Sequence, residues 1–174
     1  MFLAGCATTG PVTPGASLRW TFDTDLEDWT PGVVDDVVGG AGWGTSQWRS
    51  WCGTDRPRGC VMLDGVGGEG QPNAWIANTV ALPADVTTLR FDTSAHNRDL
   101  ADSSYRVRLI DAADGEHVLV PWSVTSGAED VYNWSTVTVP IGAFAGQTVT
   151  FLFEGADNGP GFHEQRYYDD IEID

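Results

Sequence analysis

Hydrophobic and polar residues alternate with a period of two along most of the chain. In the segment 104–110, Tyr105, Val107 and Leu109 alternate with two arginines. Successive side chains of a β-strand point to opposite faces of the sheet, so this pattern is typical of a strand with one buried face. No window of ten or more residues has the spacing of an amphipathic helix. The pattern therefore predicts an all-β fold.

About ten short strands are predicted in this way, separated by turns rich in Gly, Pro, Asp and Asn. They cover residues 18–22, 32–38, 60–63, 74–82, 87–93, 104–110, 117–120, 134–139, 147–154 and 167–173. Many short strands with frequent turn signals are typical of an antiparallel β-sandwich or barrel. We therefore expect residues 17–174 to form one antiparallel β-sandwich domain and residues 1–16 to be a separate segment.

The first segment has the features of a leader and a tether. The letters LAGC, ending at Cys6, resemble the lipobox of bacterial lipoproteins, in which Cys6 would carry the lipid. Residues 7–16 are small residues with Pro, Gly and Thr, as in a flexible tether. We expect an exported protein of the bacterial cell envelope, attached to the membrane only by a lipid at Cys6. The alternative is a chance match of four residues in a cytosolic protein.

The charge of the chain excludes two classes of partner. Among 174 residues, 25 are Asp or Glu and 9 are Lys or Arg, for a formal net charge of −16. This charge repels the phosphates of nucleic acids and the surfaces of anionic membranes. Hydrophobic residues make up 41% of the chain, which is too large a share for a disordered acidic segment.

Cys52 and Cys60 enclose a turn-rich stretch, GTDRPRG. Neither a CxxC spacing nor a cluster of histidines indicates a zinc site. In an exported protein two such cysteines are expected to form a disulfide, and two free thiols are the alternative. Closing a loop of this size stabilises the fold by about 2.5 kcal/mol in the loop-entropy treatment.

Several stretches, in order along the chain, resemble the galactose-binding-like jelly rolls, a group that includes MAM-type domains and carbohydrate-binding modules. They are WTFDTDLEDW at 20–29, AWI at 74–76, VALP at 80–83, TLRF at 88–91, YRVRL at 105–109, WSTVTV at 134–139, AFAGQTV at 143–149 and YYDDIEI at 167–173. The resemblance covers residues 18–174 and implies a jelly-roll β-sandwich. It also implies that Trp20, Trp29, Trp75 and Trp134 lie in the core.

The resemblance further implies a structural calcium ion between the first and last strands, with Asp23, Asp25 and Asp169 as ligands. By alternation with Ile171, Asp169 is expected to face inward, where a carboxylate needs a partner. Calcium takes about 6–8 oxygen ligands, which an acidic turn supplies in part. The alternative is that Asp169 accepts backbone hydrogen bonds or pairs with an arginine. Asp170 is expected to face solvent.

Aromatic and planar polar side chains in the loops are the candidate sugar-binding residues. Aromatic faces stack on the C–H patches of sugars, and forked polar groups bind hydroxyls. The candidates are Trp43, Trp48, Arg49 and Trp51 in one segment, His96 and Arg98 in a second, and His163 and Arg166 in a third. For the three Trp the alternative is a small core under the loop between the two cysteines, and for the other segments it is solvated loop charge.

We therefore expect a non-catalytic, monomeric, carbohydrate-binding module. A structural or adhesion domain without affinity for glycans is the first alternative, and a small glycan-active hydrolase or lyase is the second. The sequence contains neither a GxSxG nor an HExxH motif. The acids at 170–174 have the spacing of glycanase carboxylates, but the acid that would follow them is missing.

Overall fold

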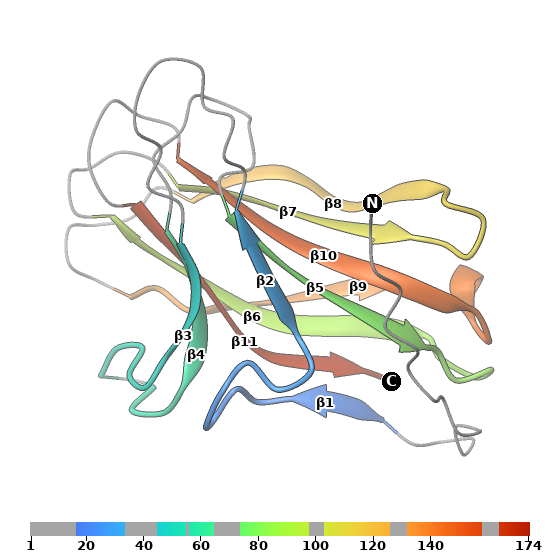
Figure 1. Ribbon diagram of the computed structural model, residues 1–174, viewed down its shortest axis with the longest axis horizontal. Helices are drawn as coiled ribbons and strands as arrows, with labels where there is room; N and C mark the ends of the chain where they lie inside the picture. The colour runs from blue at the N-terminus through green and yellow to red at the C-terminus, as the bar shows by residue number, and fades with distance from the viewer. Residues whose placement is uncertain are drawn as a thin grey trace.

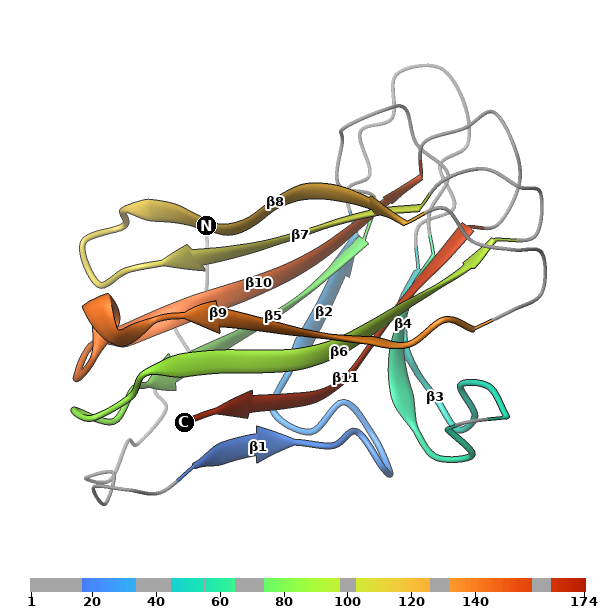
Figure 2. The ribbon, with the colours of Figure 1, turned by 180° about the vertical axis from the view of Figure 1, so that it is seen from behind.

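The computed structural model describes residues 17–33, 45–54, 56–64, 74–97, 103–125, 132–157 and 164–174. These residues form eleven β-strands and one 3-10 helix. The strands make two antiparallel sheets that pack face to face, as Figures 1 and 2 show from opposite sides. The predicted all-β, antiparallel sandwich is therefore confirmed.

Sheet A contains six strands in the order β3-β4-β11-β6-β9, with β1 also paired to β11. Their bounds are β1 (Leu18–Trp20), β3 (Thr45–Arg49), β4 (Cys60–Asp64), β6 (Thr88–Asn97), β9 (Ser135–Pro140) and β11 (Glu164–Ile173). The last strand is central. Its first half pairs with β4 and its second half pairs with β1, so the first and last described strands lie side by side (Figure 1).

Sheet B contains five strands in the order β2-β5-β10-β7-β8. Their bounds are β2 (Thr30–Val33), β5 (Ala74–Ala81), β7 (Ser103–Ile110), β8 (Glu116–Thr125) and β10 (Thr148–Asp157). The 3-10 helix, Gly142–Phe144, connects β9 to β10 and thereby links the two sheets.

Alternate residues of both sheets point into the space between them and form the main core. On β10, Phe151 and Phe153 are fully buried. The ring of Phe153 packs edge-on against those of Trp29, Phe91 and Tyr168, an arrangement that aromatic quadrupoles favour. Alternation along the sequence therefore identifies the core face of this strand correctly.

Two of the four tryptophans expected in the main core lie elsewhere. Trp20 and Trp29 are part of that core. Trp75 points to the outer face of sheet B because it alternates with Ile76, which points inward. Trp134 packs on the outer face of sheet A, in a second and smaller core.

The described strands also differ from the predicted ones in number and length. Strand β3 was not predicted, because its sequence, TSQWR, shows no hydrophobic alternation. Strands β6, β8 and β11 are longer than predicted, and residues 34–38 of the second predicted strand lie outside the described residues. Within the described part of the chain, no helix is long and apolar enough to cross a membrane.

Candidate functional site

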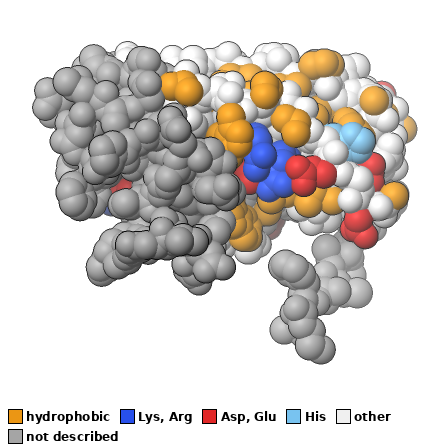
Figure 3. Space-filling model, turned by 90° about the horizontal axis from the view of Figure 1, so that it is seen from above, with side chains coloured by type: hydrophobic (Ala, Val, Ile, Leu, Met, Phe, Trp, Pro, Cys, Tyr) orange, Lys and Arg blue, Asp and Glu red, His pale blue; other side chains and the backbone are white. Residues whose placement is uncertain are grey.

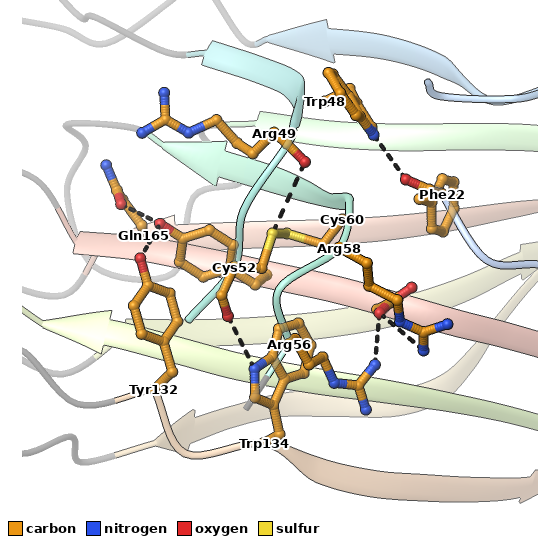
Figure 4. The surroundings of a disulfide bond; sticks show 12 residues. Phe22, Trp48, Arg49, Cys52, Arg56, Arg58, Cys60, Tyr132, Trp134 and Gln165 are labelled. Atoms are coloured by element: carbon orange, nitrogen blue, oxygen red, sulfur yellow. Dashed lines mark hydrogen bonds and ion pairs between the residues drawn. A yellow bond between two sulfur atoms is a disulfide. The ribbon is translucent and has the colours of Figure 1, made fainter. Parts of the chain in front are cut away.

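The outer face of sheet A is partly covered by the loop between Cys52 and Cys60. These two cysteines form a disulfide, with their Cα atoms 6.2 Å apart, as predicted. The indole Nε1–H of Trp134 donates to the carbonyl of Cys52 at 3.2 Å, which ties the loop to the sheet (Figure 4). Together with Met62 and Tyr167, the disulfide forms a second core outside the sandwich.

An aromatic patch lies beside this second core and consists of Trp51, Tyr132, His96 and Tyr167. The indole of Trp51 is 51% exposed and meets the ring of Tyr132 edge-on, with 5.6 Å between centroids. Tyr132 in turn stacks on His96 at 4.8 Å and contacts Tyr167 at 5.2 Å. The patch therefore has one exposed indole, that of Trp51, which packs against a cluster of aromatic rings.

Polar groups border the aromatic patch on one side. The hydroxyl of Tyr167 donates to the side-chain oxygen of Gln165, which Figure 4 places beside the patch. The amide nitrogen of Gln165 in turn donates to Asp64 at 3.0 Å. Burial raises the pKa of Tyr167, so this hydroxyl stays protonated and remains a donor. A surface pocket of about 360 Å³ lies next to the patch and is lined by Trp48, Arg49, Ser50 and Trp51.

The structure brings together only some of the predicted ligand-binding residues. Trp48, Arg49 and Trp51 line the same pocket, and His96 belongs to the aromatic patch. The indole Nε1–H of Trp48 donates to the carbonyl of Phe22 at 2.7 Å (Figure 4). Trp48 therefore packs against the main core, and not in the small core under the disulfide loop that was the alternative for this residue.

Arg166 lies on the other side of sheet A from the aromatic patch. It is 1% exposed, its guanidinium lies 4.7 Å from the ring centroid of Tyr105, and its Nη2 donates to the carbonyl of Ser103 at 2.7 Å. It is therefore enclosed between the sheets and is not presented on the surface. Trp43, Arg98, His163 and Cys6, the other predicted site residues, lie outside the described residues.

The expectation that Asp169 faces the main core is wrong. A bulge between Asp169 and Glu172, with a φ of 48° at Asp170, breaks the alternation of β11. Tyr168 and Ile171 both point into the main core, so Asp169 points to the outer face of sheet A, where the disulfide loop buries it completely.

Asp170 is also buried, at 8% exposed, and does not face solvent as expected. Burial raises the pKa of Asp169 to about 6, against the lowering effect of a hydrogen bond from Arg56. Burial would also raise the pKa of Asp170, but a hydrogen bond from Arg19 and the charges of Arg58 and Arg56 outweigh it and lower that pKa. Both carboxylates therefore have arginine partners, as the alternative to a metal ion requires.

The other two expected calcium ligands, Asp23 and Asp25, lie in the exposed turn after β1. Asp23 accepts a hydrogen bond from the hydroxyl of Thr21 at 3.0 Å, and Asp25 accepts one from the backbone N–H of Glu27 at 2.7 Å. Among the residues that the structure describes, no three His, Cys, Asp or Glu side chains are grouped so as to hold a metal ion.

The outer face of sheet B carries a second candidate site, which the sequence patterns did not predict. At its centre, Glu154 is 1% exposed and accepts two forked hydrogen bonds. Arg106 donates to it at 2.8 and 3.1 Å, and Arg108 donates to it twice at 2.7 Å. Forked guanidinium–carboxylate bonds are strong and directional, so they hold both arginines in fixed orientations.

Two tryptophans flank this network, one on each side. Trp75 is the cross-strand partner of both Glu154 and Gly32, and its indole lies over Gly32 on the edge strand β2. On the other side, the guanidinium of Arg106 lies 4.6 Å from the ring centroid of Trp122 on β8. Trp75, Glu154, Arg106 and Trp122 thus form a row across four strands, which we call the Trp–Glu–Arg row.

Apolar side chains surround the charged groups of this face. Ala77, Leu152 and Val118 are the cross-strand neighbours in the next row, on either side of Arg108. Figure 3 looks onto the molecule from above β7 and β8 and shows basic and acidic side chains side by side among hydrophobic ones. The face therefore combines fixed polar groups with apolar contact area.

Comparison with known proteins shows which solved structures share the fold of this chain. No family model and no curated protein matches the sequence. The K1 cleaved adhesin domain of Lys-gingipain from Porphyromonas gingivalis W83 matches with a TM-score of 0.64 and 18% identity, over 92% of this chain and 98% of that domain. This chain and the K1 adhesin domain therefore share the β-sandwich fold.

Carbohydrate-binding modules match as well. TmCBM27, a module studied for its specific recognition of mannan, has a TM-score of 0.58 and 9% identity, over 91% of this chain and 98% of its own. The CBM22-1 xylan-binding domain of Paenibacillus barcinonensis Xyn10C has a TM-score of 0.54 and 11% identity, over 94% and 96%. At these identities the similarity concerns the fold alone, and it confirms the expected jelly-roll type of sandwich.

Proposed function

We propose that this protein is a non-catalytic carbohydrate-binding module whose ligand lies across the Trp–Glu–Arg row of sheet B. The observation that carries the proposal is the pair of half-buried indoles, Trp75 and Trp122, on either side of a fixed guanidinium–carboxylate network. Indole faces stack on the C–H patches of sugar rings, and Nη1 of Arg106, which takes no part in the fork with Glu154, is placed to donate to hydroxyl oxygens.

The spacing of the row favours a chain of sugars over a single sugar. Trp75 on β5 and Trp122 on β8 are separated by β10 and β7. Neighbouring strands lie about 4.8 Å apart, so the two strands that carry these indoles are roughly 14 Å apart. The ligand that spans both of them is therefore an oligosaccharide or polysaccharide.

The charges of the row favour a neutral glycan. Glu154 accepts from both arginines, and Arg108 also pairs with Glu116 at 2.7 Å. The positive and negative charges of this network balance, and the net charge of −16 on the whole chain repels acidic polysaccharides. The fold similarity to modules named for mannan and xylan binding supports the same class of ligand.

The aromatic patch of sheet A is the alternative site for a glycan. Trp51 offers an exposed indole, and Arg49 and the pair formed by Gln165 and Asp64 offer polar groups beside it. The Trp–Glu–Arg row ranks first because two indoles flank its polar groups, whereas the patch has one exposed indole.

A protein-interaction domain is the second candidate function. Val118 and Val124 are 53% and 57% exposed on β8, which is an edge strand of sheet B. Exposed apolar residues on an unpaired strand edge are typical of surfaces that bind another chain. The similarity in fold to an adhesin domain is compatible with this function.

We also propose that the protein is exported and acts as a monomer attached to the cell envelope through a lipid at Cys6. The disulfide between Cys52 and Cys60 supports export, because such bonds persist in oxidising compartments.

Affinity electrophoresis of the full chain against neutral and acidic polysaccharides tests the proposal. We expect retardation by at least one neutral polysaccharide and a loss of about tenfold in affinity in Trp75→Ala and in Trp122→Ala. Trp51→Ala is the matched control and should bind normally. Loss of binding in Trp51→Ala alone would move the site to the aromatic patch, and no binding to any glycan would favour the protein-interaction function.

A further inference from the structure

Three aspartates form a buried acidic cluster on the outer face of sheet A. Asp92 on β6 and Asp169 on β11 are cross-strand partners, and Asp170 follows in the bulge. All three are at most 8% exposed. Carboxylates that are removed from water in this way require positive partners or hydrogen-bond donors.

Arg56, from the loop closed by the disulfide, reaches all three carboxylates. Its Nη1 donates to Asp169 at 2.6 Å and to Asp170 at 3.1 Å, and its Nη2 donates to Asp92. The guanidinium lies 4.2 Å from the ring centroid of Trp134. One planar cation is therefore held between an indole face and a set of carboxylates, a geometry that suits arginine better than lysine.

Arg58, from the same loop, lies between the last strand and the turn after β1. Its Nη2 bonds to Asp170 and lies 3.5 Å from Asp169, and its Nη1 lies 3.6 Å from Asp23. Figure 4 shows both guanidinium groups meeting one carboxylate. This is the place at which the family resemblance puts a calcium ion.

The residues as placed do not fit that ion. Asp169 Oδ1 accepts the backbone N–H of Asp170 at 2.7 Å, and its Oδ2 accepts from Arg56. Glu27, in the acidic turn, accepts the backbone N–H of Phe22 at 2.8 Å. Calcium needs about 6–8 free oxygen ligands, and a guanidinium in the same position repels it.

We propose that Arg56 and Arg58 replace the divalent cation in this chain, so that the fold is independent of calcium. The two guanidinium groups neutralise the acidic cluster and join the last strand to the turn after β1. Because both arginines lie between Cys52 and Cys60, the disulfide holds the two positive charges over the cluster.

Thermal unfolding of the full chain, followed by circular dichroism, tests this proposal. The Tm of the unmodified protein should be the same in EDTA and in excess CaCl2. Arg58→Gln should lower the Tm by several degrees, since it leaves a buried carboxylate short of a partner. Arg90→Gln is the matched control, because Arg90 pairs with Glu172 on the same sheet outside the cluster, and its Tm should change little.

Calcium should raise the Tm of Arg58→Gln and leave that of the unmodified protein unchanged, because removing a guanidinium frees carboxylate oxygens for a metal ion. A lower Tm of the unmodified protein in EDTA, restored by calcium, would overturn the proposal. An unchanged Tm in Arg58→Gln would overturn it as well.

Discussion

The indole of Trp75 lies over Gly32, its cross-strand partner on β2. A Cβ atom at position 32 would stand 2.0 Å from Cζ2 of the Trp75 ring. The ring can hold this position only because residue 32 has no side chain. Gly32 therefore fixes one end of the Trp–Glu–Arg row.

Substitution of this glycine should displace the indole. We expect Gly32→Ala to reduce glycan affinity about as much as Trp75→Ala, roughly tenfold, because the Trp75 ring must move. Gly142→Ala is the matched control, since a Cβ there would meet its nearest atom at an ordinary 3.4 Å. Normal glycan affinity in Gly32→Ala would argue against a role for the present position of Trp75.

Glu154 should contribute to stability as well as to the row. Glu154→Gln removes the buried carboxylate that Arg106 and Arg108 share, and we expect the free energy of unfolding in urea to fall by about 2 kcal/mol. Glu116→Gln is the control, because Glu116 is half exposed where it pairs with Arg108, so its effect should stay below about 0.5 kcal/mol. Equal effects of the two substitutions would contradict the central place of Glu154 in this network.

Loss of the disulfide should loosen the second core. We expect Cys52→Ala with Cys60→Ala to lower the free energy of unfolding by about 2.5 kcal/mol. The same pair of substitutions should change the fluorescence of Trp134, which donates to the carbonyl of Cys52. Thiol titration of the unreduced, denatured protein, with the labelled peptides identified, should find neither Cys52 nor Cys60 reactive, and labelling of both would rule out the bond.

Asp111 should titrate at unusually low pH. It lies 2.7 Å from Nε2 of His117 and accepts the backbone N–H groups of Ala113 and Gly115, each at 2.9 Å. These contacts, that with His117 foremost, lower the pKa of Asp111 from its ordinary value of 3.8. Asp111 therefore adds stability above its ordinary pKa, and this contribution is lost as the pH falls through the lowered value.

An NMR titration of the Asp111 carboxyl carbon measures this pKa directly. His117→Gln should raise it toward the ordinary value. A pKa of 3.8 or higher in the unmodified protein would contradict the lowering.

Sequence patterns predict the sandwich well, because alternation reports which face of a strand is buried. Strand β3 has no such pattern, since Trp48 is the one large apolar residue in it and the strand is placed by pairing to β4 at the sheet edge. The orientation of Asp169 cannot be predicted from alternation either, because a single bulge residue, Asp170, reverses the order of faces.

The candidate site on sheet B could be predicted from the sequence only in part. Alternation with Ile76 and Phe153 places Trp75 and Glu154 on an outer face, so part of the signal is present in the sequence. What the sequence lacks is the register, which aligns Trp75, Glu154 and Arg106 on three strands, and the shift in the pairing of β7 with β8 where Trp122 meets Arg106. The family resemblance implied that Trp75 lies in the core, and this expectation is wrong.

The most direct test of glycan binding at the Trp–Glu–Arg row follows the indole N–H signals of the eight tryptophans by NMR as a neutral polysaccharide fragment is added to the protein. We expect the signals of Trp75 and Trp122 to shift together, while those of Trp20 and Trp29 in the main core stay in place. A shift confined to Trp51, or no shift of Trp75 and Trp122 when binding is seen by another method, would contradict binding at this row.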